Sequence, residues 1–181
     1  MRLLLCSLAI ALTFTSAAQA ATAPPADQAA APKSRTVTRA YLLTGLVGGG
    51  DAMNAMAAQL RAHGVLVTIS SYTEADAIAA DACAHRGDRL IIMGHSLGAT
   101  ASASIATKAA ACGARNVTMV GIDPPNFGAT VSGVSHAVNF VGELNGKIAG
   151  AQNIMVPGYG HWQIVDDPAM QRRFLAAALG H

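Results

Sequence analysis

Residues 89–98 read RLIIMGHSLG, and this stretch gives the clearest indication of the fold class. The first five are almost wholly apolar and too few for a helix, which is typical of a short buried strand. Gly94 follows at once, and Leu97 opens a helical pattern that runs to Cys112, just before a glycine. The stretch therefore predicts a strand that turns sharply into a helix.

The rest of the chain alternates strands and helices in the same way. Short apolar or β-branched runs predict strands, at residues 39–44, 65–70, 116–122, 137–141 and 153–156. Segments with helical periodicity and capping residues predict helices, at residues 51–63, 73–86 and 168–179. Strands that are apolar on both faces and alternate with helices form a parallel sheet covered on both sides. We therefore predict an α/β protein, a three-layer α/β/α sandwich around a mostly parallel sheet of about six strands.

Composition allows one domain and excludes several classes of protein. The chain has 181 residues, of which 52% are hydrophobic and 12% charged. This length builds one good core but not two ordinary domains, and the apolar fraction is too high for a disordered chain. A net charge of +2 gives no support for a nucleic-acid-binding surface.

The N-terminal region predicts export. Residues 1–20 combine Arg2, a long apolar run and the small-residue motif AQA at 18–20, which is the plan of a secretory signal peptide. Residues 21–35 are rich in Ala and Pro and predict a tether, so the folded domain is expected at residues 36–181. We expect a secreted or periplasmic protein without a stable membrane anchor after cleavage; an uncleaved N-terminal anchor is the alternative.

Two cysteines remain after removal of the signal peptide, Cys83 and Cys112. They could form a disulfide, because an exported protein meets an oxidising compartment. They could equally be two small buried apolar residues. The sequence leaves both possibilities open.

The motif Gly-x-Ser-x-Gly at residues 94–98 predicts a nucleophile. A serine on a sharp strand-to-helix turn needs small flanking residues, and the turn lifts its hydroxyl above the sheet. The turn also points the backbone N–H of Leu97, at the positive end of a helix, toward a developing oxyanion. The alternative is a glycine-rich turn around an ordinary Ser96.

A nucleophilic serine needs a base and an orienting acid. His161 lies just past the last expected strand, in a loop with a glycine on either side of Tyr159, and is the best-placed base. Asp123 and Glu143 are the two acidic residues between Ser96 and His161, and each follows a strand. We favour Asp123, a short carboxylate before two prolines, with Glu143 as the alternative acid.

These motifs resemble those of the α/β-hydrolases, in particular small lipases and esterases. Residues 94–98 have the form of the nucleophile elbow most common in lipases, and VGIDP at residues 120–124 resembles the stretch that carries the catalytic aspartate of pancreatic-type lipases. LTGLVGG at residues 43–49 resembles the oxyanion loop of bacterial lipases. The resemblance implies the N–H of Leu46 as a second oxyanion donor, although Thr44 stands where these lipases carry a histidine.

The resemblance covers residues 38–179 and implies a minimal α/β-hydrolase fold. No long insertion follows the last three expected strands, which leaves little room for a lid. An open site of this kind suits soluble or modest-chain esters.

Together these features predict an exported serine hydrolase that cleaves carboxylic esters through a Ser96–His161–Asp123 triad and an acyl-enzyme. The expected substrate is a small-molecule or lipid ester, with no cofactor, metal or nucleic acid. A thioesterase or acyltransferase with the same triad is one alternative, and a catalytically idle binding protein with this fold is another. The sequence leaves the oligomeric state open.

Overall fold

The structure, a computed structural model, describes residues 36–46 and 49–180, so the predicted signal peptide and tether lie outside it. Six strands form one sheet in the order β2-β1-β3-β4-β6-β8, and every neighbouring pair is parallel. The strands are β1 (Thr38–Thr44), β2 (Leu66–Ser71), β3 (Arg89–His95), β4 (Val117–Ile122), β6 (His136–Val141) and β8 (Gln152–Met155). The predicted parallel sheet of about six strands is confirmed.

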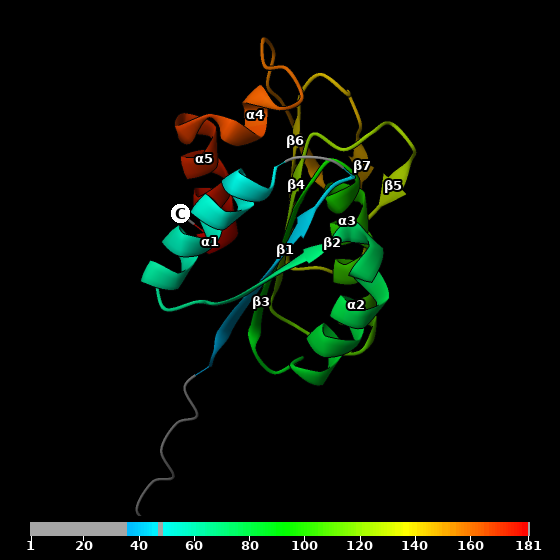
Figure 1. Cartoon of the computed structure of the whole chain (residues 1–181). Helices are drawn as coiled ribbons and strands as arrows, with labels where there is room; N and C mark the ends of the chain where they lie inside the picture. Colours follow the sequence, from blue (N-terminus) through cyan, green and yellow to red (C-terminus); the bar gives the residue numbers. More distant parts are fainter. Residues whose placement is uncertain (1–35, 47–48, 181) are drawn as a thin grey trace, which may run out of the picture. The chain divides into compact units, whose positions relative to one another are not determined.

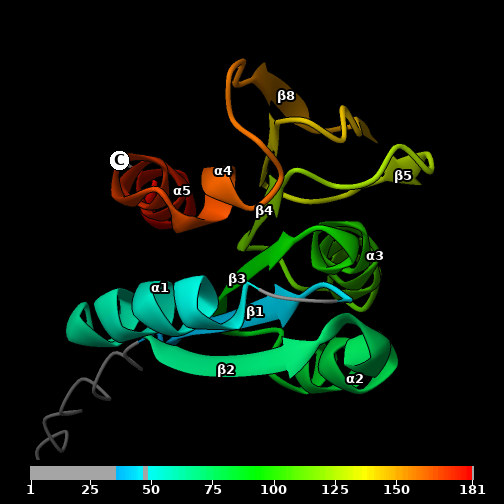
Figure 2. The ribbon, with the colours of Figure 1, turned by 45° about the horizontal axis from the view of Figure 1, so that its top comes forward.

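Helices cover both faces of this sheet (Figures 1 and 2). One face carries α1 (Gly50–Ala62) and α5 (Pro168–Leu179), with the short α4 (Gln163–Asp166) before α5. The opposite face carries α2 (Ala75–Ala84) and α3 (Leu97–Ala111), with the 3₁₀ turn η1 (Tyr72–Glu74) before α2. The predicted three-layer arrangement is therefore confirmed.

Strand β3 shows why the apolar run is continuous. Ile91 and Met93 point into the core beneath α1 and α5, whereas Leu90 and Ile92 point into the core beneath α2 and α3. Successive side chains of a strand face opposite sides, so a strand buried on both faces needs apolar residues at every position. The strand also runs two residues further than expected, through Gly94 and His95 into the turn.

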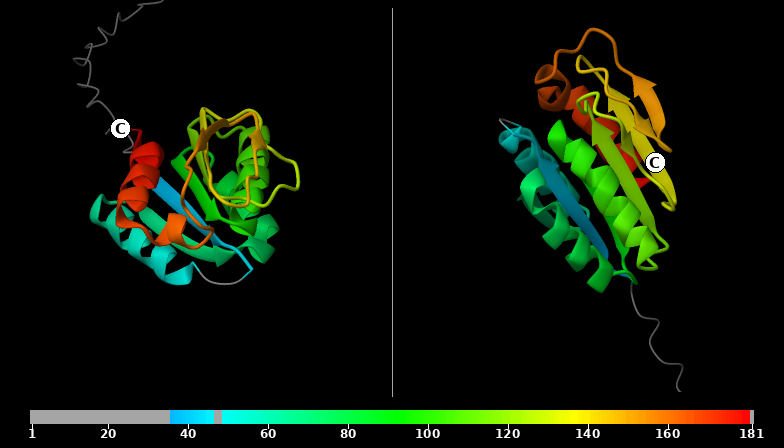
Figure 3. Two further views of the ribbon diagram at one scale, coloured as in Figure 1. Left: turned by 90° about the horizontal axis from the view of Figure 1, so that it is seen from above. Right: turned by 90° about the vertical axis from the view of Figure 1, so that its right-hand side faces the viewer.

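A small parallel pair of strands, β5 (Ala129–Thr130) and β7 (Ile148–Ala149), was not predicted. It lies beside α3 in the connections that follow β4 and β6, which contain no helix in the described chain (Figure 3). Two residues are too few for a periodic pattern, so the sequence carries no signal for this pair.

A disulfide joins Cys83 to Cys112, with their Cα atoms 5.8 Å apart. Cys83 lies in the last turn of α2 and Cys112 caps the end of α3, so the bond ties these neighbouring helices together at one end. Of the two possibilities that the sequence left open, the structure contains the bridge.

Candidate active site

Ser96 stands at a strained turn between β3 and α3, with φ 60° and ψ −127°. Both flanking glycines are needed there: a Cβ on Gly94 would overlap the carbonyl of Gly98, and a Cβ on Gly98 would overlap the carbonyl of Leu43. The N–H of Ser96 donates to the carbonyl oxygen of Ile122 on β4, 2.9 Å away. Strain of this kind persists only where the surroundings enforce it, and it is common at functional sites.

The predicted oxyanion donors come from two segments next to this turn. Leu97 is the first residue of α3, so its N–H has no acceptor within the helix. Gly45 follows β1 and lies so close that a Cβ there would come within 2.8 Å of the Ser96 Cβ. Leu46 comes next, with its side chain 71% exposed. The loop after β1 therefore passes directly beside Ser96.

The imidazole of His161 is held by Asp123. Its Nδ1 lies 2.8 Å from Asp123 Oδ2, and the carboxylate is fully buried while the His161 side chain is 12% exposed. Asp123 Oδ1 accepts from the N–H groups of Gly142, at 2.9 Å, and Leu144, at 3.1 Å. A Cβ on Gly142 would lie 3.0 Å from the Asp123 carboxyl carbon, so the glycine gives the carboxylate its space. Oδ1 thus faces the backbone, whereas Oδ2 faces the base and lies 3.3 Å from the N–H nitrogen of Leu144.

Asp123 is also strained, with φ 42°. Among the described residues only Ser96, Asp123 and Asn145 combine a side chain with positive φ. Two of these three positions are the predicted nucleophile and acid, and both stand where a strand ends.

Glu143 takes a different position from Asp123. Its Oε2 accepts from the backbone N–H of His161 at 2.8 Å, whereas the ring nitrogen faces Asp123. The favoured acid, Asp123, and the alternative, Glu143, therefore hold different atoms of one histidine, and the contact of Glu143 with its backbone was not foreseen.

His95 is a further member of the site that the sequence analysis missed. It is 1% exposed, and its ring stacks on that of His161 with centroids 4.4 Å apart and planes 28° apart. Burial, with a smaller contribution from neighbouring His161, lowers the pKa of His95 to about 4, so the ring is neutral at pH 7. Its position inside the elbow, after a buried strand, was the one available signal.

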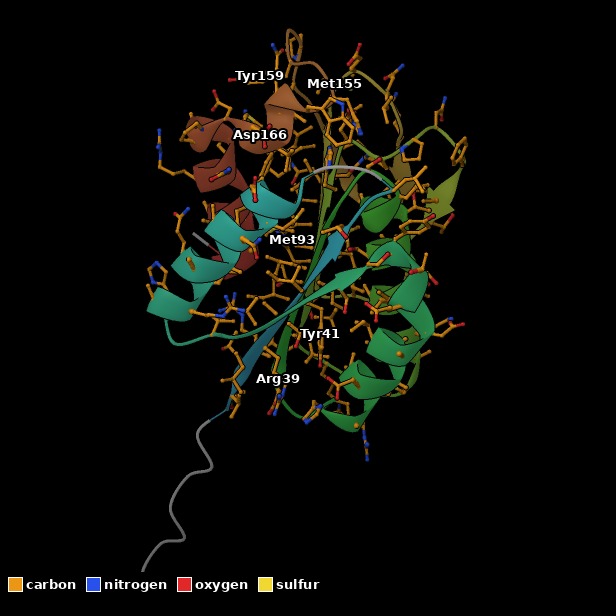
Figure 4. All side chains as sticks on the ribbon, viewed as in Figure 1. Arg39, Tyr41, Met93, Met155, Tyr159 and Asp166 are labelled. Carbon is orange, nitrogen blue, oxygen red and sulfur yellow. A yellow bond between two sulfur atoms is a disulfide. The ribbon has the colours of Figure 1, made fainter. Side chains whose placement is uncertain are left out.

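The site lies at the carboxyl edge of the sheet, where parallel α/β sheets bind ligands. Tyr159, in the loop before His161, lies at the end of the molecule opposite Arg39 on β1 (Figure 4). The described residues contain no hydrogen bond between Ser96 Oγ and the His161 ring, although Ser96 directly follows the stacked His95. Such contacts are often long before substrate binds.

Neither a metal site nor a membrane span is visible in the part of the chain that the structure describes. Residues 36–46 and 49–180 include no group of three His, Cys, Asp or Glu side chains able to hold an ion. No helix within these ranges is long and apolar enough to cross a membrane.

Comparison with known proteins supports the fold. No protein-family model matches the chain, and no curated protein matches it. A crystal structure from Xanthomonas campestris pv. campestris, of a protein assigned to the hydrolases of the alpha/beta superfamily, superposes with a TM-score of 0.56 at 15% identity, over 80% of this chain and 99% of that one. The NocB thioesterase domain from the nocardicin cluster superposes with a TM-score of 0.53 at 12% identity, over 81% of this chain and 96% of that one.

The chain thus has an α/β-hydrolase-like fold, as the motif resemblance implied.

Proposed function

We propose that this protein is an exported serine hydrolase that cleaves carboxylic esters, with Ser96 as nucleophile, His161 as base and Asp123 as orienting acid. One observation carries the proposal: the His161 ring is bound at Nδ1 by a buried carboxylate and stacks on His95, which directly precedes a serine held at positive φ on a strand-to-helix turn. The likeness of the fold to a protein assigned as a hydrolase and to a thioesterase domain agrees with this chemistry.

The first half of the reaction forms an acyl-enzyme. Nδ1–H of His161 donates to Asp123, which leaves Nε2 unprotonated and able to take the proton of Ser96. The Ser96 oxygen attacks the carbonyl carbon of the ester, and the negative charge moves to the carbonyl oxygen. The N–H groups of Leu97 and Leu46 stabilise this oxyanion.

The second half releases the acid. It follows collapse of the first tetrahedral intermediate, in which His161 gives its proton to the departing alcohol and the acyl-enzyme is left. A water molecule then loses a proton to His161 and attacks the acyl carbon. Collapse of the second tetrahedral intermediate frees the carboxylic acid and returns the proton to Ser96.

Exposed apolar side chains beside the site favour a substrate with an apolar acyl group. Leu46 is 71% exposed and follows Gly45, where an added Cβ would meet Ser96. Trp162 is 43% exposed, with its ring centroid 4.7 Å from that of His161. Burying such side chains against a substrate stabilises binding by about 25 cal/mol per Å² of apolar surface. A small-molecule or lipid ester fits this surface.

A thioester is the second candidate substrate, because one of the structural neighbours is a thioesterase domain. The triad attacks either carbonyl in the same way and differs only in the leaving group. Transfer of the acyl group to an acceptor other than water, and binding without catalysis, are further outcomes that the experiments below separate.

Export is supported by two independent features. Residues 1–20 have the plan of a signal peptide, and the Cys83–Cys112 disulfide is of the kind that persists in oxidising compartments. Mass spectrometry of the protein from the medium or periplasm tests this part: the mature chain should begin at Ala21. A chain that keeps its first residues and stays in the cell would contradict it.

The nucleophile is tested by Ser96→Ala in the purified mature protein. This variant should lose fluorophosphonate labelling and about 10⁴-fold or more of its ester hydrolysis. Ser102→Ala is the matched control, because Ser102 is buried in α3 and its hydroxyl has no partner among the described residues. A panel of p-nitrophenyl esters, acyl thioesters and acyl acceptors then identifies the reaction. Near-normal turnover by Ser96→Ala would end the proposal.

A further inference from the structure

His161 lies in a segment that has no regular secondary structure of its own. Between Met155 and Gln163 the chain forms neither strand nor helix, and Gly158 adopts φ 85°. A loop of this kind is free to move unless its backbone is bound from outside. A base must nevertheless stay within hydrogen-bonding reach of its nucleophile, since a displacement of about 1 Å can lower the rate about 100-fold.

Two side chains from other elements bind the backbone of His161. The N–H of His161 donates to Glu143 Oε2 at 2.8 Å, from the loop after β6. Its carbonyl oxygen lies 3.0 Å from Nε2 of His95, at the end of β3. With Asp123 on the ring, three separate side chains hold one residue.

The contact at the carbonyl determines the tautomer of His95. A carbonyl oxygen only accepts, so the hydrogen of the neutral His95 ring must be on Nε2. Nδ1 is then an acceptor, and it faces Gly49, where a Cβ would come within 3.1 Å. The low pKa of His95 keeps this arrangement through the neutral range in which a histidine base works.

The His95 ring also limits rotation of the base. It stacks on the His161 ring, and Trp162 meets both rings edge-on, with centroid distances of 5.5 Å to His95 and 4.7 Å to His161. Because His95 directly precedes Ser96, the same strand end positions the nucleophile and supports the base.

We propose that His95 is a positioning residue for the base: its Nε2–H donates to the His161 carbonyl and its ring face packs against the His161 ring. Glu143 holds the other side of the same backbone by accepting from the His161 N–H. This inference rests on the proposed hydrolase function. It assigns His95 no proton transfer and no contact with the substrate.

Three variants separate the two contacts. His95→Phe keeps a flat ring but removes the donor, whereas His95→Gln keeps an amide N–H near the position of Nε2 and removes the ring. His95→Ala removes both. The matched control is His136→Gln, since His136 is an exposed histidine at the start of β6.

We expect kcat to fall about 10- to 100-fold in His95→Phe and further in His95→Ala, with KM within about twofold of wild type. His95→Gln should recover most of the loss seen in His95→Phe. Rates are normalised to the enzyme that reacts with fluorophosphonate, so a smaller folded fraction cannot imitate the effect. A loss confined to KM, or wild-type kcat in both His95→Phe and His95→Ala, would overturn the proposal.

A second measurement does not depend on turnover. The low-field proton resonance of Nδ1–H in the His161–Asp123 pair should be sharp in the wild type and in His136→Gln, and broadened by solvent exchange in His95→Ala. An unchanged resonance in His95→Ala would overturn the proposal even if wild-type activity were established. Absence of fluorophosphonate labelling and ester turnover in the wild type would instead refute the proposed function, while the resonance still decides whether His95 positions His161.

Discussion

Replacing Asp123 by Asn tests the proposed triad most directly, because the structure determines how the amide must lie. Oδ1 accepts from the N–H groups of Gly142 and Leu144, so the amide oxygen takes its place. The NH₂ group then stands where Oδ2 was, 2.8 Å from Nδ1 of His161. An NH₂ group only donates, so His161 must leave Nδ1 bare and carry its hydrogen on Nε2.

That tautomer cannot take the proton of Ser96. The value of kcat/KM should therefore fall about 10⁴-fold, which corresponds to about 5 kcal/mol of transition-state stabilisation. The fold should persist, since the hydrogen bonds from Gly142 and Leu144 to Oδ1 remain and only the longer contact of Leu144 with Oδ2 is lost. The free energy of unfolding in urea should change by less than about 2 kcal/mol.

The matched control is Glu143→Gln, whose amide oxygen still accepts from the His161 N–H. We expect a loss of less than about tenfold, because only a charge away from the ring disappears. The assay is hydrolysis of a p-nitrophenyl ester at neutral pH by both variants. A nearly active Asp123→Asn beside an inactive Glu143→Gln would refute the reasoning and transfer the acid role to Glu143.

Three further predictions follow from single contacts. Gly45→Ala places a Cβ 2.8 Å from the Ser96 Cβ and should lower kcat/KM about 10- to 100-fold by displacing the nucleophile. A normal rate would contradict this, because it would mean that the loop after β1 shifts to accept the Cβ and leaves Ser96 in place. As pH falls from 6.5 to 4, the unfolded chain takes up a proton that buried His95 does not, so the wild type should lose about 3 kcal/mol of unfolding free energy more than His95→Gln; equal losses in urea titrations would contradict this. Reducing the Cys83–Cys112 bond frees a loop with a sequence separation of 29 and should lower the unfolding free energy by about 3–4 kcal/mol; an unchanged urea midpoint would contradict this.

Elements whose signals are local were predictable. Helix α5 begins after Asp167, whose Oδ1 accepts from the N–H groups of Ala169 and Met170, and it ends at Gly180 with φ 81°. Both signals lie within a few residues of the helix ends they mark. The elbow at Ser96 is only partly of the same kind: a Cβ on Gly94 would overlap Gly98 within the turn, whereas a Cβ on Gly98 would overlap the carbonyl of Leu43 on β1. The pair β5–β7 escaped prediction because each strand forms only by pairing with the other.

Local patterns in the sequence were enough to predict the six strands of the main sheet, the longer helices, the parallel α/β class and the positions of the expected nucleophile and base. Each of these depends on neighbouring residues or on apolar periodicity. The sequence favoured Asp123 over Glu143, but contacts between distant segments are what place the Asp123 carboxylate at the His161 ring. Asp123 and Glu143 follow the adjacent strands β4 and β6, and the choice between them depends on the positive φ of Asp123 and the space left by Gly142. The Cys83–Cys112 bond likewise required α2 and α3 to lie side by side, a contact between segments that no local pattern encodes.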